Sequence, residues 1–101
     1  MNLELHNSWE YVGDDWWEWS AYLKGSDLPR VDYVEYILHQ SFKKPLLKVT
    51  DPENGFRLDT SGWGIFDLKA VVQFNNGTAT LLTHRIRLEY KPKIGRTDKV
   101  D

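Results

Sequence analysis

Two-fold alternation of apolar and polar residues on both sides of an Asn-Gly pair is the feature that most constrains this chain. Apolar side chains recur at every second position from Phe66 to Phe74, which is the period of a strand with one buried face. The segment Asn75-Asn76-Gly77 then supplies residues that tolerate positive φ, as a tight hairpin turn requires. The alternation resumes from Leu82 to Tyr90. The sequence therefore predicts a long β-hairpin over residues 66–90.

Shorter runs with the same period precede this hairpin. They predict strands over residues 6–12, 17–23, 34–38, 46–50 and 56–59. Prolines and Gly/Asn/Asp clusters separate the runs, and no stretch keeps the spacing of an amphipathic helix. Strands at this density predict an all-β fold, an immunoglobulin-like antiparallel β-sandwich of about 7–8 strands. We expect one domain over residues 1–92 and a polar C-terminal tail over residues 93–101.

Composition and charge narrow the classes of function. The net charge is −2, which gives no basic surface for nucleic acid. The chain has no cysteine, so it has no disulfide, thiolate metal site or cysteine nucleophile. The N-terminal residues include Glu4 and His6 where a secretory signal would be apolar, and no run is long enough to span a bilayer. We expect a cytoplasmic protein that binds neither nucleic acid nor membrane.

The sequence offers little for catalysis or metal binding. His39 and Ser41 are two positions apart, so a Ser–His dyad is conceivable, but no nucleophile-elbow motif or orienting acid accompanies them. The three histidines, His6, His39 and His84, fit no metal-ligand spacing. We therefore expect a non-enzymatic protein with no catalytic residues, no metal site and no cofactor.

Aromatic residues in predicted loops are more informative. The chain contains five Trp and five Tyr in 101 residues, more than an ordinary core requires. Trp63 lies between Gly62 and Gly64, which we expect to permit a sharp turn that projects the indole. Phe42 follows a predicted strand in a second loop. Both rings either close one end of the sandwich or form a ligand pocket, and the residue pattern alone leaves both interpretations open.

Two segments around these aromatics resemble the YEATS domain. The first ends a predicted strand as Leu38-His39-Gln40-Ser41-Phe42, and the second is Ser61-Gly62-Trp63-Gly64-Ile65-Phe66. They are similar to that family's Leu-His-x-Ser-Phe and Gly-Trp/Tyr-x-x-Phe motifs, in the same order and at suitable spacing. The resemblance extends from about Trp16 to Leu88, and the short connections are most like those of prokaryotic members. It implies an immunoglobulin-like fold, in agreement with the pattern of strands.

The resemblance also implies a function and a binding site. Eukaryotic YEATS domains read acetyl- and crotonyl-lysine, so an acylated-lysine peptide or protein is the implied partner. Phe42 and Trp63 would then hold the flat acyl amide between two aromatic faces. Ser41 and the backbone N–H of Trp63 would hydrogen-bond the amide, His39 would orient Ser41 and Phe42, and Phe66 would support the loop. Gly62 and Gly64 complete the implied site.

Two points stay open at the level of sequence. The family's first loop often supplies another aromatic contact, and here either Trp16 or Trp17 could fill that place. Two other functions also fit a sandwich with aromatic loops: a protein–protein interaction module that binds no acyl-lysine, and a carbohydrate-binding module that stacks sugars on exposed indoles.

Overall fold

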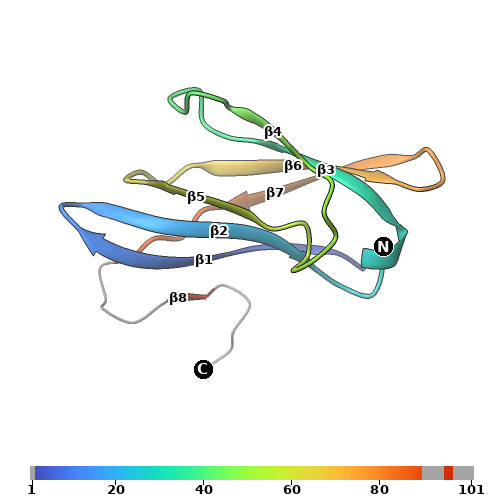
Figure 1. Cartoon of the computed structure of the whole chain (residues 1–101), viewed down its shortest axis with the longest axis horizontal. Helices are drawn as coiled ribbons and strands as arrows, with labels where there is room; N and C mark the ends of the chain where they lie inside the picture. Colours follow the sequence, from blue (N-terminus) through green and yellow to red (C-terminus); the bar gives the residue numbers. More distant parts are fainter. Residues whose placement is uncertain (1, 90–94, 97–101) are drawn as a thin grey trace.

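The computed structural model describes residues 2–89 and 95–96, which form two antiparallel sheets packed face to face. Figure 1 shows the strands of both sheets running roughly along the longest axis of the molecule. One sheet has the strand order β5-β2-β1-β8 and the other β4-β3-β6-β7. The predicted all-β, immunoglobulin-like sandwich is confirmed.

The first sheet is built on a long hairpin of β1 (Glu4–Gly13) and β2 (Trp16–Lys24). Residues 13–15 all have positive φ in the turn between them, and the Asp15 backbone N–H donates to the Tyr11 hydroxyl at 3.1 Å. Strand β5 (Leu58–Gly62) pairs with β2, and β8 (Gly95–Arg96) pairs with β1. The free edge of β5 therefore borders one side of this sheet within the described residues.

The second sheet contains the hairpin that the Asn-Gly turn predicted. Strands β6 (Asp67–Phe74) and β7 (Ala79–Arg85) pair along their length. Gly77 has φ +89°, and the Phe74 backbone N–H donates to the Thr78 carbonyl at 2.8 Å, which closes the turn. Strand β3 (Val31–Ile37) pairs with β6 and with the edge strand β4 (Leu46–Val49).

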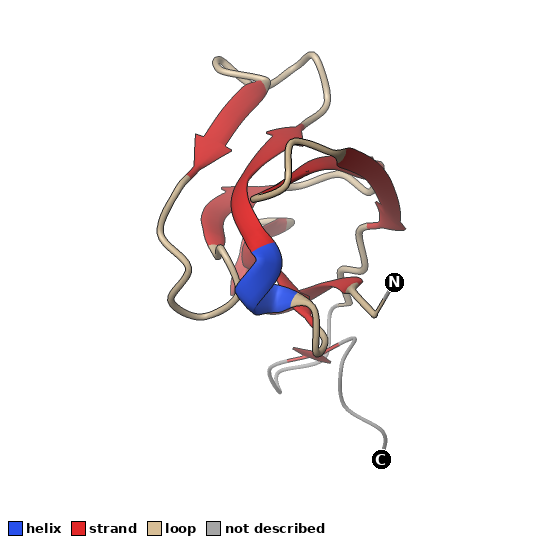
Figure 2. Cartoon of the chain, turned by 90° about the vertical axis from the view of Figure 1, so that its right-hand side faces the viewer, coloured by secondary structure: helices blue, strands red, loops and turns tan. Residues whose placement is uncertain are grey.

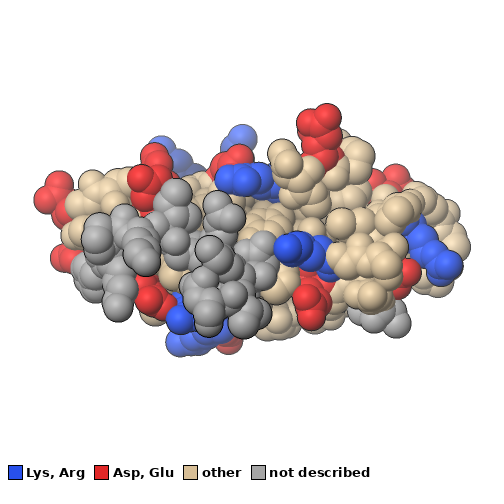
Figure 3. Space-filling view, turned by 90° about the horizontal axis from the view of Figure 1, so that it is seen from below, with Lys and Arg blue, Asp and Glu red and all other residues tan. Residues whose placement is uncertain are grey.

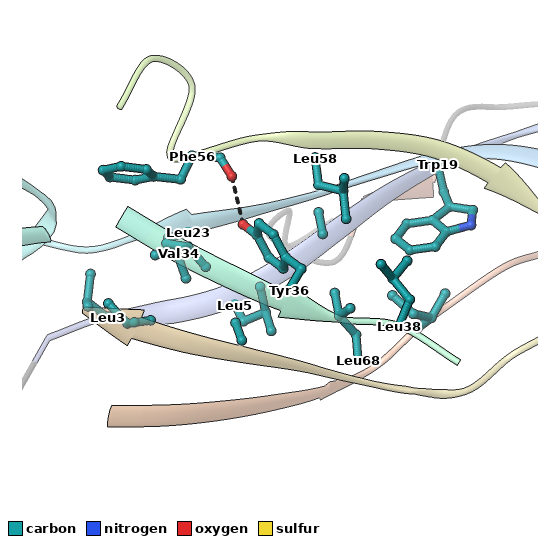
Figure 4. Close-up of a cluster of buried hydrophobic side chains, with 14 of the residues drawn as sticks. Leu3, Leu5, Trp19, Leu23, Val34, Tyr36, Leu38, Phe56, Leu58 and Leu68 are labelled. Atoms are coloured by element: carbon teal, nitrogen blue, oxygen red, sulfur yellow. Dashed lines mark hydrogen bonds between the residues drawn. The ribbon is translucent and has the colours of Figure 1, made fainter. Parts of the chain in front are cut away.

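Side chains from the inner faces of both sheets make one core. Figure 4 shows Trp19 and Leu23 from one sheet packed against Val34, Tyr36 and Leu68 from the other. All of them are 2% exposed or less, so the alternation read from the sequence does mark the inward faces. The Tyr36 hydroxyl donates to the Phe56 carbonyl at 2.7 Å inside this core. Burial raises the pKa of Tyr36, because the phenolate would be poorly solvated there.

Several element bounds differ from those predicted. The return strand was expected to reach Tyr90, but β7 ends at Arg85, and Tyr90 lies outside the described residues. Beyond β7 the alternation still marks buried Ile86 and Leu88, yet the backbone no longer follows a regular ladder. Instead the side chain of Asn7, fully buried in β1, bonds both the N–H (3.1 Å) and the carbonyl (2.9 Å) of Arg87.

A short 3₁₀ turn, η1 (Leu28–Arg30), was also not expected. It lies in front in Figure 2, which looks along the sandwich from the right-hand end of Figure 1. Pro29 falls in its first turn, where a missing N–H removes no hydrogen bond.

The predicted tail, residues 93–101, lies outside the described residues apart from Gly95–Arg96. The division into a domain over 1–92 and a tail therefore stays a prediction. None of the described helices is long and apolar enough to cross a membrane. On the face seen in Figure 3, described basic and acidic side chains are interspersed.

Candidate functional site

Three connections meet at one end of the sandwich and enclose a pocket of about 690 Å³. They are the turn before β2, the loop between β3 and β4, and the loop between β5 and β6, all at the left in Figure 1. The residues that line the pocket are Trp16, His39, Ser41, Phe42, Lys43, Ser61, Gly62, Trp63, Gly64, Ile65 and Phe66. The structure therefore brings together every residue expected at the site except Trp17.

Backbone hydrogen bonds fix the loop that carries Phe42. The Leu38 N–H donates to the Pro45 carbonyl at 2.7 Å, so the loop closes where β3 and β4 stop pairing. Inside it the Phe42 N–H donates to the His39 carbonyl at 3.0 Å and forms a turn. Leu38 is buried and anchors the start of the loop in the core. The position of Phe42 is thus set by the backbone as well as by side-chain packing.

His39 and Ser41 form a defined polar pair on the same loop. The Ser41 backbone N–H donates to Nδ1 of His39 at 3.1 Å, and the Ser41 hydroxyl lies 2.9 Å from the same nitrogen. A backbone N–H can only donate, so Nδ1 carries no hydrogen and accepts the hydroxyl hydrogen as well. The lone pairs of Ser41 Oγ then remain able to accept an N–H from a ligand, because Ser41 is exposed.

Phe42 is half-buried and packs over the end of the core. Its ring centroid is 5.7 Å from that of Phe66 and 6.4 Å from that of Trp19, which meets it edge-on. Phe66 also contacts Trp19 at 5.8 Å and His39 at 6.2 Å between centroids. These contacts, typical of aromatic pairs in cores, make Phe42 and Phe66 a rigid floor whose support is the buried Trp19.

Trp63 behaves differently from the other rings. The residue is 70% exposed, so it does not close the end of the sandwich as a buried plug. Gly62, the last residue of β5, is buried below it; a Cβ there would lie 3.6 Å from Trp19 Nε1 and 3.7 Å from Phe42 Cζ. The chain bends at Trp63, but neither Gly62 nor Gly64 has positive φ, so this bend does not depend on the left-handed conformation that favours glycine. At Gly62 the absent side chain instead keeps the floor open.

The two tryptophans at the start of β2 have opposite surroundings. Trp16 lines the pocket and is 41% exposed. Trp17 is 4% exposed, packs against Tyr11 and donates from Nε1 to the Glu89 carbonyl at 2.8 Å. The expected additional aromatic contact can therefore come from Trp16, and Trp17 belongs to the core. Lys43 lines the pocket too, although sequence reasoning did not include it among the site residues.

Comparison with known proteins decides the family. A family model for the prokaryotic YEATS domain matches residues 17–87, well over half of the chain. The chain belongs to the prokaryotic YEATS domain family. That range includes both motifs of this YEATS domain and leaves Trp16 just outside it. No curated protein matches the sequence.

Solved structures similar to this YEATS domain share its fold. The Yaf9 YEATS domain bound to H3K27ac superposes with a TM-score of 0.76 at 20% identity, covering 94% of this chain and 78% of that domain's chain. The yeast AF-9 homolog protein Yaf9 gives 0.74 at 20% identity, covering 94% and 74%. A Yaf9 YEATS domain recognizing an H3K122suc peptide gives 0.65 at 18% identity, covering 93% and 80%. At these identities the likeness shows the sandwich alone.

Proposed function

We propose that this YEATS domain is a non-enzymatic recognition module whose pocket binds an acylated lysine, acetyl or crotonyl, of a peptide or protein. The observation that carries the proposal is the pocket itself, which is lined by the exposed Trp63 and the half-buried Phe42. The solved relatives add support, because Yaf9 structures contain acylated histone peptides.

The aromatic lining suits an acylated lysine better than a free one. Acylation removes the ammonium charge and adds a planar amide. A free ammonium would lose part of its hydration in a pocket lined by Phe42 and Trp63, whereas a neutral flat group gains contact with these rings. The volume of about 690 Å³ leaves room for an acyl chain longer than acetyl.

The polar groups of the pocket complement an amide. Ser41 Oγ directs its hydrogen to His39 and can accept the amide N–H of the acyl-lysine. The backbone N–H of Trp63 follows Gly62 and is our candidate donor to the acyl carbonyl. In this arrangement His39 is a positioning residue, which acts on the ligand through Ser41.

The contact between His39 and Ser41 also resembles a nucleophile beside a general base. Two features favour binding over hydrolysis. No carboxylate bonds to His39 within the described part of the chain, so nothing there orients the ring as an acid does in a triad. The acceptor nitrogen is also shared with the Ser41 backbone N–H, which competes for the same lone pair.

Peptide titration tests the proposal. Three peptides of one sequence carry a central lysine that is acetylated, crotonylated or unmodified, and calorimetry measures each Kd. We expect binding of both acylated peptides and at least tenfold weaker binding of the unmodified peptide. Equal affinity for all three would contradict acyl-lysine recognition and would favour a general protein–protein interaction module.

Ser41→Ala is the matched variant for the polar contact. It removes the hydroxyl acceptor from an exposed residue. We expect the variant to keep its melting temperature and to lose about tenfold in affinity for the acetylated peptide, the effect of one lost hydrogen bond of about 1.4 kcal/mol.

A further inference from the structure

The outer edge of β5 carries unpaired backbone groups. The Leu23 N–H donates to the Gly55 carbonyl at 2.8 Å, so the odd-numbered residues of β2 direct their backbone groups toward β5. The β5 residues opposite them are even-numbered and point back to β2, so Asp59 and Ser61 direct their N–H and C=O groups to the free edge. In the described part of the chain no strand pairs with this edge, and no loop backbone bonds to it.

This row of unpaired groups ends in the pocket. Gly62 lies opposite Trp17, so its carbonyl points toward β2. The N–H and C=O of a trans peptide unit point in opposite directions, so the Trp63 N–H points away from β2, like the groups of Ser61. Ser61 and Trp63 both line the pocket, and a second hollow of about 560 Å³, lined in part by Asp59, shares Ser61 with it. The free edge and the pocket are therefore continuous.

We propose that the peptide carrying the acyl-lysine binds as an added strand along the free edge of β5, while its acyl-lysine occupies the pocket. This inference deepens the proposed function and rests on it. The four-carbon stem of lysine separates the acyl amide from the peptide backbone, so an amide at Trp63 leaves that backbone free to pair with Ser61 and Asp59. An added strand bonds through main-chain groups, so the edge strengthens binding with little demand on the sequence around the acylated lysine.

The length of the edge favours a ligand anchored in the pocket over a second copy of this chain. Asp59 and Ser61 together offer four backbone groups, too few to hold two domains together, since stable interfaces bury about 1,200 Å² or more. A peptide already held by its acyl-lysine gains from these groups without a second association step. Strand β5 also contains no proline and no lysine, the residues that commonly protect an edge strand from pairing.

Amide hydrogen exchange followed by NMR tests the added strand on the wild-type protein. The probe is a heptapeptide of alternating Ser and Thr with a central acetyl-lysine. In the free protein the amide of Thr60, which faces β2, should be protected, and those of Asp59 and Ser61 should exchange rapidly. We expect saturation with the peptide to slow exchange at Asp59 and Ser61 by about tenfold or more. Leu81, whose N–H faces the free edge of β7, is the control and should not change.

The possible results separate the inference from the proposed function. Bound peptide with unchanged exchange at Asp59 and Ser61 overturns the added strand and leaves acyl-lysine recognition standing. Protection of the same two amides in the free protein that grows with protein concentration also overturns it, because a second copy would then occupy the edge. If the heptapeptide does not bind at all, the proposed function fails and the inference fails with it.

Backbone N-methylation of the heptapeptide gives a second readout on the wild-type protein. Only alternate residues of an added strand direct their N–H toward the neighbouring strand. Single N-methyl groups at successive positions should therefore alternate in effect, with affinity lowered about three- to tenfold at one position and nearly unchanged at the next. Equal effects at neighbouring positions, or none at any position, contradict a strand.

Ser61→Pro and Leu81→Pro form a matched pair of variants. Each removes one N–H that faces a free edge, where a proline breaks no ladder bond. We expect Ser61→Pro to bind the heptapeptide about three- to tenfold more weakly than Leu81→Pro does. Acetyl-lysine capped at both ends, which has no neighbouring residues to pair, should bind both variants equally. Equal heptapeptide affinity in two folded variants counts against the β5 edge.

Discussion

Replacing Trp63 by alanine separates a ligand wall from a structural plug. Trp63 is 70% exposed, whereas Trp19, which supports the same pocket from below, is 2% exposed. The same substitution at both positions removes the same atoms from two environments. A binding role for Trp63 predicts that only its ligand affinity suffers, and a structural role predicts that stability suffers as well.

The expected loss of stability follows from the buried area. A fully buried tryptophan removes about 250 Å² from water, so the buried part of Trp63 is about 75 Å². At about 25 cal/mol per Å² this gives about 2 kcal/mol as an upper bound, which the Cβ retained by alanine reduces to about 1 kcal/mol. Trp19→Ala empties a buried site, for which losses of about 3–5 kcal/mol are typical.

Urea unfolding followed by circular dichroism measures the loss of unfolding free energy in Trp63→Ala and in Trp19→Ala, and titration with the acetylated peptide measures affinity. We expect Trp63→Ala to lower the free energy of unfolding by about 1 kcal/mol and the affinity at least tenfold, because the acyl amide loses one aromatic face. If Trp63→Ala destabilises the fold as much as Trp19→Ala does, the ring is a plug. Unchanged peptide affinity in a stable Trp63→Ala protein would refute its role as a wall.

Two further predictions concern one buried and one half-buried polar group away from the pocket. Tyr36→Phe leaves the buried carbonyl of Phe56 without its partner, so we expect a loss of about 1–3 kcal/mol in urea unfolding; Tyr33→Phe, on a half-buried ring, is the control and should change stability by less than about 0.5 kcal/mol. The pKa of His84 is lowered by burial and, to a smaller extent, by the charge of His6. The unfolded chain therefore binds a proton at this histidine more readily than the folded chain does. The free energy of unfolding is consequently highest above about pH 6.5 and decreases as the pH falls below that value. Unfolding at pH 7.5 and 5.5 should show this decline, and His84→Gln, which keeps an N–H for Asn7, should reduce it; an identical decline in the variant would assign the effect to another group.

The period-two pattern predicted the strands because a sheet with one buried face imposes that period on its sequence. It was weakest where a single long-range contact decides the backbone. Strand β5 was expected over residues 56–59 but spans Leu58–Gly62. Phe56 instead adopts φ +57°, and its carbonyl accepts the Tyr36 hydroxyl from the opposite sheet. Nothing in the local sequence around residue 56 encodes a partner twenty positions away.

The choice between Trp16 and Trp17 was within reach of the sequence. Trp17 begins a series of apolar residues at every second position, continued by Trp19, Ala21 and Leu23, and such a series marks the core face of a strand. Trp17 is indeed buried. Trp16, one position earlier, belongs to the opposite face of the strand. Lys43 had no such signal, since it lies in a loop where no period relates neighbouring side chains.

Pairing between β2 and β5 explains why the site needs the whole sandwich. Trp17 lies opposite Gly62 in that register, so Trp16 and Trp63 extend past the paired residues at the same end of the sheet. The loop with Phe42 comes from the other sheet, and Phe66 lies in the connection where the chain crosses from β5 in one sheet to β6 in the other. A slip of one residue between β2 and β5 would turn the inward residues of β5 outward and shift Trp63 relative to Trp16. The face on which a side chain lies can be read from the sequence, but the register between β2 and β5 depends on packing between the sheets. Most of the residues that line the pocket were therefore predictable, and its geometry was not.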